Sequence, residues 1–132
     1  MIAAMPSPAP LKVFLADDSL QIRQRVMSML GAISADVVGE GATPDACIAG
    51  ILALQPDVVV LDHQLEGGTG LDVLKAVRAA DREVAFVVFS NNAGPAYRRR
   101  YLSEGARSFL DKSTEFDQLV AAVADAGPRA VH

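Results

Sequence analysis

Four short apolar runs, each followed at once or one residue later by a polar side chain, constrain the fold of this chain most. The runs are residues 13–16, 58–61, 84–89 and 109–110. Uninterrupted apolar runs of this kind are typical of strands buried on both faces of a parallel sheet that helices cover. The polar residues that follow the runs are Asp17 with Asp18, Asp62, Ser90 and Lys112.

These polar side chains are expected to meet at one edge of the sheet, because ligands of open parallel sheets bind at the carboxyl ends of the strands. Three carboxylates brought together repel one another, and a divalent cation relieves that repulsion. Taken alone, Asp17 and Asp18 fit a helix N-cap equally well. Their combination with Asp62 and Lys112 favours a site instead.

Size and composition limit the classes of protein that this chain can be. Its 132 residues suit one domain, and 51% hydrophobic residues argue against disorder. The net charge of −4 argues against a general binder of nucleic acids or membrane surfaces. No apolar stretch is long enough to span a bilayer, and the lone Cys47 cannot form an internal disulfide. We expect one domain over residues 11–126, between a flexible lead at 1–10 and a tail at 127–132.

Strand and helix signals alternate along the whole domain. Strands are expected at residues 11–16, 36–40, 57–61, 84–89 and 107–110. Helices are expected at residues 20–30, 44–54, 71–80 and 96–104, with a mobile loop at 66–70. A fifth helix is expected after a cap at 113–115, with Phe116, Leu119, Val120 and Val123 facing inward. Five strands alternating with five helices predict a parallel sheet with right-handed crossovers and helices on both faces.

The polar residues at the strand ends resemble the receiver domain of two-component response regulators, over roughly residues 11–126. That family has an acidic pair after its first strand, an aspartate after its third, a Thr or Ser after its fourth and a Lys after its fifth. Gly70 and the Gly105-Ala106 pair also match the family. The resemblance implies a flavodoxin-like, doubly wound α/β fold with five helices and a five-stranded parallel sheet of order 2-1-3-4-5.

The resemblance also implies roles for the site residues. Asp62 is the expected phosphoacceptor, a carboxylate nucleophile that forms an acyl phosphate. Mg²⁺ is the expected cofactor, held by Asp18, Asp62 and the backbone carbonyl of Gln64, with Asp17 acting largely through water. Lys112 is expected to pair with one phosphate oxygen, and Ser90 to donate a hydrogen bond to another.

Other positions are expected to switch or tune this site. In the family, the hydroxyl at the Ser90 position moves toward the phosphate, and an aromatic residue on the last strand, here Phe109, changes rotamer. Gln64 and Asn92 occupy positions that tune hydrolysis of the acyl phosphate, and two amides there either position the attacking water or block it. The chain departs from the family at three positions: Asn91 replaces a small residue, Glu66 adds a charge and Ser113 replaces a frequent proline.

The only dense basic patch is formed by residues 98–100, on a predicted helix. Consecutive helical residues fan out by roughly 100° each, so the three arginines do not share one face. A solvated helix surface is one interpretation. The other is a face for an acidic partner, to which Arg98 contributes and to which the flanking Tyr97 and Tyr101 add contact area.

The predicted function is that of a stand-alone, cytoplasmic receiver, phosphorylated by a sensor histidine kinase or phosphotransfer protein. It would signal to a downstream protein by binding or by onward phosphotransfer, without binding nucleic acid or membrane directly, and it is not an enzyme in the usual sense. The first alternative is a degenerate receiver that binds partners without phosphorylation. The others are an aspartyl-phosphate phosphohydrolase, which the amide of Gln64 disfavours, and a flavin carrier, which the acidic strand ends disfavour.

Overall fold

The computed structural model describes residues 10–80 and 82–128. Its main strands are β1 (Leu11–Ala16), β2 (Ala35–Gly41), β3 (Val58–Leu61), β6 (Ala85–Ser90) and β7 (Ser108–Asp111). A small hairpin consists of β4 (Gln64–Leu65) and β5 (Gly68–Thr69). The helices are α1 (Leu20–Leu30), α2 (Pro44–Leu54), α3 (Gly70–Ala79), α4 (Pro95–Ser103) and α5 (Leu119–Ala126), the last preceded by a 3-10 turn at Phe116–Gln118.

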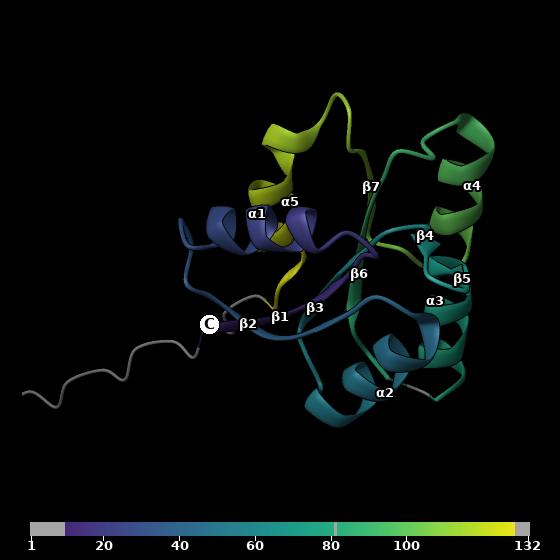
Figure 1. Ribbon diagram of the computed structural model, residues 1–132, viewed down its shortest axis with the longest axis horizontal. Helices are drawn as coiled ribbons and strands as arrows, with labels where there is room; N and C mark the ends of the chain where they lie inside the picture. The colour runs from purple at the N-terminus through teal and green to yellow at the C-terminus, as the bar shows by residue number, and fades with distance from the viewer. Residues whose placement is uncertain (1–9, 81, 129–132) are drawn as a thin grey trace, which may run out of the picture.

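The five main strands form one sheet in the order β2-β1-β3-β6-β7, and every neighbouring pair is parallel. Counted without the hairpin, this is the predicted order 2-1-3-4-5, so the flavodoxin-like, doubly wound fold class is confirmed. Helices α1 and α5 lie on one side of the sheet, and α2, α3 and α4 lie on the other (Figure 1). Ala16 of β1 is paired with Leu61 of β3, so these two strands end side by side.

Two hydrophobic cores, one on each side of the sheet, hold the layers together. The sheet alternates between them, so that Val58 and Val60 face α1 and α5 while Val59 and Leu61 face α2, α3 and α4. Because β3 is buried on both faces, it reads as a continuous apolar run in the sequence. Because the apolar run ends where the strand ends, the end of β3 could be predicted from the sequence.

Local capping chemistry fixes where the helices begin. Ser19 accepts a hydrogen bond from the Ile22 N–H at 3.2 Å, and Thr43 accepts one from the Ala46 N–H at 3.2 Å. Thr69 and Asp72 form a reciprocal capping box at the start of α3. The start of α1 is therefore set directly after the acidic pair that follows β1.

Residues 66–70, predicted as a mobile loop, include the turn and second strand of a hairpin and the first residue of α3. Gln64 pairs with Thr69, and Leu65 pairs with Gly68, in an antiparallel hairpin that turns at Gly67, where φ is +82°. The Glu66 N–H donates to the carbonyl of Ala42 at 2.8 Å, which ties the hairpin to the start of α2. The segment predicted as a loop therefore contains the short strand β5 and a turn that is hydrogen-bonded to the loop before α2.

The predicted cap at residues 113–115 is wrong. The Ser113 N–H and hydroxyl both donate to the Asp111 carboxylate, at 2.8 and 2.6 Å, so the serine closes a turn instead of starting a helix. A 3-10 turn follows, and α5 begins at Leu119 without a side-chain cap. Leu119 and Val123 are buried as predicted, whereas Val120 is only half-buried.

Two further expectations concern the ends of the chain and membranes. The predicted lead at 1–10 and tail at 127–132 lie largely outside the described residues, which start at Pro10 and end at Pro128. No helix in the described part of the chain has the length and apolar character needed to cross a membrane.

Candidate functional site

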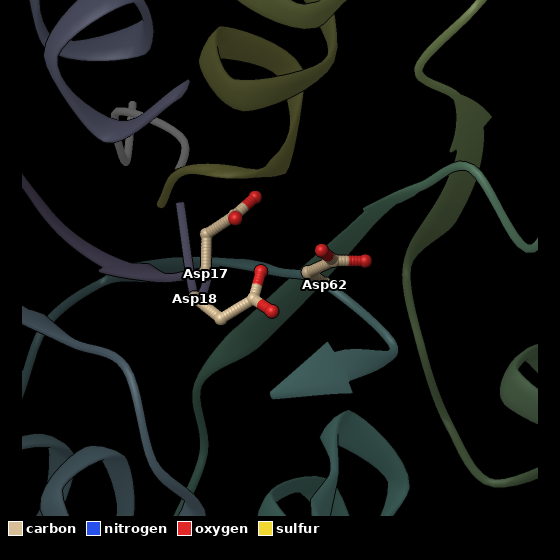
Figure 2. Close-up of side chains that lie close together, drawn as sticks. All are labelled: Asp17, Asp18 and Asp62. Atoms are coloured by element: carbon tan, nitrogen blue, oxygen red, sulfur yellow. The ribbon is translucent and has the colours of Figure 1, made fainter. Parts of the chain in front are cut away.

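Two aspartates meet where β1 and β3 end side by side. The Asp62 N–H donates to the carbonyl of Ala16 at 2.8 Å, which continues the β1–β3 ladder by one step. The Asp17 N–H likewise donates to the carbonyl of Gly41 at 3.1 Å. Figure 2 shows the carboxylates of Asp17, Asp18 and Asp62 gathered at this edge of the sheet. The sheet thus places acidic side chains that are far apart in the sequence within one small volume.

These three carboxylates form a candidate metal site. One oxygen from each of Asp17, Asp18 and Asp62 lies within 4.8 Å of the others. Asp17 and Asp62 are buried, whereas Asp18 is exposed. A cluster of hard oxygen ligands with one open side fits Mg²⁺, which is bound in proteins by one or two carboxylates together with water and phosphate oxygens.

Lys112 supplies the positive charge of the site from the turn after β7. Its Nζ lies 2.5 Å from Asp17 Oδ2 and 2.9 Å from Asp62 Oδ2, and its side chain is 7% exposed. Desolvation acts to lower the pKa of Lys112, but the hydrogen bonds and charges of the two aspartates outweigh it and hold that pKa above its ordinary value. The ammonium is therefore firmly charged at neutral pH and bridges two carboxylates.

For the pKa of Asp17, unlike that of Lys112, the effect of burial outweighs the hydrogen bonds. Burial raises the pKa of its carboxyl group, although the hydrogen bonds from Lys112 and from the Ser19 N–H, at 2.9 Å, oppose the rise. The nearby charge of Asp62 raises it further. Burial and the charge of Asp62 thus disfavour the ionised form of Asp17, and a bound cation would stabilise that form.

Ser90 ends β6 beside this cluster and is fully buried. Its hydroxyl oxygen accepts a hydrogen bond from the Asn92 N–H at 3.1 Å, and its carbonyl accepts one from the Lys112 N–H at 3.0 Å. The hydroxyl hydrogen of Ser90 is thus available to another acceptor. The side chain of Asn91 is exposed, and Asn92 is half-buried.

The hairpin after β3 brings the remaining predicted residues to the rim. The Gln64 N–H donates to Asp62 Oδ1 at 3.3 Å, while the Gln64 and Glu66 side chains are exposed. Gly70 packs closely against the backbone of Asp62: a Cβ added at Gly70 would meet the Asp62 carbonyl oxygen at 2.2 Å. The Lys112–Ser113 peptide is trans, as is every peptide in the described ranges.

Comparison with known proteins identifies the family. The family described as the response regulator receiver domain matches residues 13–124. The chain belongs to this receiver family. Receivers are the phosphorylation-based signalling domains of two-component systems, so membership favours the receiver interpretation over the phosphohydrolase and flavin-carrier alternatives.

The relatives of this receiver include transcriptional regulators. The chain is 32% identical over 123 residues to the "Probable transcriptional regulatory protein NarL" of Mycobacterium tuberculosis, covering 91% of this chain and 56% of that protein. It is 29% identical over 118 residues to the DNA-binding transcriptional activator DevR/DosR of the same species, covering 89% of this chain and 54% of that protein. The chain thus spans about half the length of these curated relatives.

A solved receiver has the same architecture. The signal receiver domain of NarL from M. tuberculosis superposes with a TM-score of 0.83 at 33% identity, covering 89% of this chain and 96% of that one. The match covers nearly the whole solved domain and confirms that this chain has the receiver fold.

The two residues predicted for a partner face of the receiver differ in their exposure. Arg98 is 42% exposed at its side chain, and its guanidinium donates to the Phe109 carbonyl at 2.9 Å and to Glu115 at 3.3 Å. Tyr101, in contrast, is 1% exposed, so it offers no contact area, and its prediction as a partner-face residue is wrong. Tyr97 is the exposed tyrosine of this helix, at 41%.

Phe109, the predicted switch residue of the receiver, lies on β7 and is buried against α4. It is 2% exposed, its ring centroid lies 5.8 Å from that of Tyr101, and the Arg98 guanidinium lies 5.3 Å from its centroid. A rotamer change of Phe109 would disturb both α4 contacts. Its role as a switch stays a prediction.

Sequence analysis missed His63, which directly follows the predicted phosphoacceptor. The His63 Nδ1 lies 2.6 Å from the Tyr101 hydroxyl, and its ring packs edge-on against Tyr97 at 4.8 Å between centroids. Asp62 is therefore connected through its neighbour to α4. A histidine after a buried strand, and tyrosines four residues apart on a helix, are the signals that could have suggested this contact.

Tyr101→Phe is expected to lower the free energy of unfolding by about 1 kcal/mol, because it leaves the half-buried His63 nitrogen without its partner. Urea unfolding monitored by circular dichroism measures the change. Tyr97→Phe is the matched control, since the Tyr97 hydroxyl makes no hydrogen bond within the described residues. Equal losses in both variants would contradict a specific His63–Tyr101 bond.

Proposed function

We propose that this receiver accepts a phosphoryl group on Asp62, in the presence of Mg²⁺, from a sensor histidine kinase or a phosphotransfer protein. The observation that carries the proposal is the buried Lys112 ammonium, which contacts the Asp62 and Asp17 carboxylates at the sheet edge where Asp18 adds a third. A nucleophilic carboxylate, a cation and further carboxylates for a metal are the parts that phosphoryl transfer to an aspartate requires.

Each residue has a definite task in the proposed reaction. An Asp62 carboxylate oxygen forms the new bond to phosphorus as the bond between phosphorus and the donor's leaving atom breaks. Lys112 and Ser90 hold the phosphoryl oxygens, the first by charge and the second through its available hydroxyl hydrogen. Mg²⁺, held by Asp18, Asp62 and the Gln64 carbonyl with Asp17 acting through water, would neutralise charge on the transferring group.

The phosphorylated form would act through protein contacts. Movement of Ser90 toward the phosphate and a rotamer change of Phe109 would alter the face that includes Arg98. Gln64 and Asn92 lie beside Asp62 and Ser90, where they would tune hydrolysis of the acyl phosphate. We propose a cytoplasmic protein that is not an enzyme in the usual sense and that signals by protein binding or onward phosphotransfer, with no direct contact to nucleic acid or membrane.

The alternative is a degenerate receiver that binds partners without phosphorylation. Glu66 and Asn91 motivate it, since both are exposed polar departures from the family pattern near the acceptor. The buried set of Asp17, Asp62 and Lys112 argues against it, because a chain with no use for the reaction has no need to keep these charges buried.

Intact mass after incubation with acetyl phosphate, with and without Mg²⁺, tests the proposal. Wild type is expected to gain one phosphoryl group only when Mg²⁺ is present, and Asp62→Asn is expected to gain none. No gain in wild type leaves two accounts, a degenerate receiver or a site closed to small donors by Asn91. Asn91→Ala separates them: a gain in this variant supports a closed but working site, and none supports the degenerate receiver.

A further inference from the structure

Arg23 of α1 contacts the loop that carries Asp17 and Asp18, and its side chain is only 14% exposed. One arm of its guanidinium, Nη1, donates to the backbone carbonyl of Asp17 at 2.5 Å. Its Nε donates to Glu40 Oε1 on β2 at 2.8 Å. Through Nε and Nη1, the planar guanidinium therefore joins the loop after β1 to the neighbouring strand β2.

The contact from Arg23 completes a full set of restraints on Asp17. The Asp17 N–H donates to Gly41, and its two carboxylate oxygens accept from the Ser19 N–H and from Lys112 Nζ. Among the described residues, Arg23 alone donates to the carbonyl of the buried Asp17, so this carbonyl would otherwise lack a protein partner there. Arg23 thus holds the carbonyl of the peptide that joins Asp17 to Asp18.

We propose that Arg23, oriented by Glu40, is a positioning residue that holds Asp17 and Asp18 in the geometry that binds a divalent cation. The inference rests on the metal site of the proposed function and adds a residue outside the predicted acidic and phosphate-binding set. Outer groups that orient metal ligands commonly change metal affinity by about 10–100-fold when they are replaced. Arg23 would act on the backbone of the ligands and not on the cation itself.

The sign of the effect separates positioning from charge. A positive guanidinium near a cation site disfavours Mg²⁺ by Coulomb repulsion, so removing its charge alone would tighten binding. Loss of positioning would weaken binding instead. Arg23→Lys keeps the charge but cannot reach Asp17 and Glu40 with one rigid fork, and Arg23→Gln removes the charge as well.

Isothermal titration of the full chain with Mg²⁺ is the primary test. Arg23→Lys and Arg23→Gln are both expected to bind Mg²⁺ about tenfold more weakly than wild type. Arg25→Lys is the matched control on the same helix: Arg25 is exposed and stacks on Phe116 with its guanidinium 3.9 Å from the ring centroid, so its replacement should leave the affinity unchanged.

Glu40 provides a second pair of variants in case changes at Arg23 impair folding. Glu40→Gln and Glu40→Ala remove the same charge, but only the glutamine keeps an oxygen that accepts from Arg23 Nε. We expect Glu40→Ala to bind Mg²⁺ more weakly than Glu40→Gln. Equal affinities for the two would overturn the orienting role of Glu40.

Phosphorylation by acetyl phosphate gives a readout that a general structural defect would not reproduce. Arg23→Lys should need about tenfold more Mg²⁺ for half-maximal phosphorylation yet reach the wild-type rate at saturating Mg²⁺. A lower plateau, an affinity within twofold of wild type, or tighter binding by Arg23→Gln would each overturn the inference. Failure of wild type itself to bind Mg²⁺ would remove the metal site of the proposed function, a result distinct from any difference among variants.

Discussion

Lys112→Met is expected to lower the free energy of unfolding near neutral pH by about 3 kcal/mol when Mg²⁺ is absent. The substitution removes one ammonium but leaves the Asp17 and Asp62 carboxylates, whose side chains are 9% and 6% exposed, without the cation that bridges them. Replacing both partners of a buried ion pair can be harmless, whereas removing only one leaves buried charge uncompensated. Urea unfolding of wild type and variant measures the difference.

The loss should depend on pH in a direction that the two pKa shifts fix. Folding raises the pKa of Lys112 above its usual 10.5, so its contribution is fully present below that pH and disappears as the pH rises through the folded value. Folding also raises the pKa of Asp17 above 3.8, so the folded state binds that proton more tightly than the unfolded state does. Acidification through the folded pKa therefore removes the cost of burying ionised Asp17.

The difference between wild type and Lys112→Met should accordingly be largest on the plateau between these two transitions and shrink toward both extremes. Without the Lys112 hydrogen bond the pKa of Asp17 rises further, so the variant should recover stability at a higher pH than wild type on acidification. Mg²⁺ should stabilise the variant more than wild type, since it replaces the missing charge.

Lys75→Met is the control for net charge, because it also removes one ammonium, and Lys75 is an exposed residue of α3 that is not among the site residues. It should change stability by less than about 0.5 kcal/mol. If Lys112→Met were as stable as Lys75→Met near neutral pH, the buried carboxylates would not depend on Lys112 for compensation.

The residues at the strand ends were predictable because their placement follows from the sheet alone. Strand β3 is buried on both faces, so it appears as an unbroken apolar run, and the residue after it must reach the carboxyl edge. The same argument brought Asp17 and Lys112 to that edge, where the structure places Lys112 Nζ against Asp17 and Asp62. Neither step requires knowledge of contacts between distant side chains.

The features that sequence analysis missed depend on specific contacts between particular groups, some of them far apart in the sequence. The hairpin at residues 64–69 is too short to show a periodic pattern, and the Ala42 carbonyl anchors it from another loop. The Ser113 hydroxyl could cap a helix or close a turn, and the Asp111 carboxylate two residues earlier decides for the turn. The hydroxyl of the buried Tyr101 forms a hydrogen bond with His63, which is 38 residues away in the sequence.

Gly70→Ala is expected to be the most damaging small substitution in the hairpin region. Gly70 is the first residue of α3, and a Cβ there would lie 2.2 Å from the Asp62 carbonyl oxygen and 3.0 Å from Leu61 Cγ. Backbone cannot yield as the end of a flexible side chain does, so either α3 or the segment carrying Asp62 must shift. Overpacking of this kind costs about 1–3 kcal/mol of unfolding free energy.

The same shift should also slow the proposed reaction. Displacing a reacting group by about 1 Å can cost about a hundredfold in rate, so phosphorylation of Gly70→Ala by acetyl phosphate should fall by that order. Gly94→Ala is the matched control, because Gly94 has a φ of −64° and no heavy atom lies within 4 Å of an added Cβ. It should retain both stability and phosphorylation.

The two readouts distinguish the possible responses to the added methyl group. If α3 moves away, stability falls while Asp62 keeps its contacts with Lys112 and the phosphorylation rate is retained. If the Asp62 backbone moves, both fall, because the movement disturbs the hydrogen bonds that Asp62 makes with the Ala16 carbonyl and with Lys112. We expect the second response, since the Gly70 N–H also donates to the His63 carbonyl at 2.8 Å and couples the start of α3 to the acceptor strand. Wild-type values of both quantities in Gly70→Ala would show that this close approach does not position the acceptor.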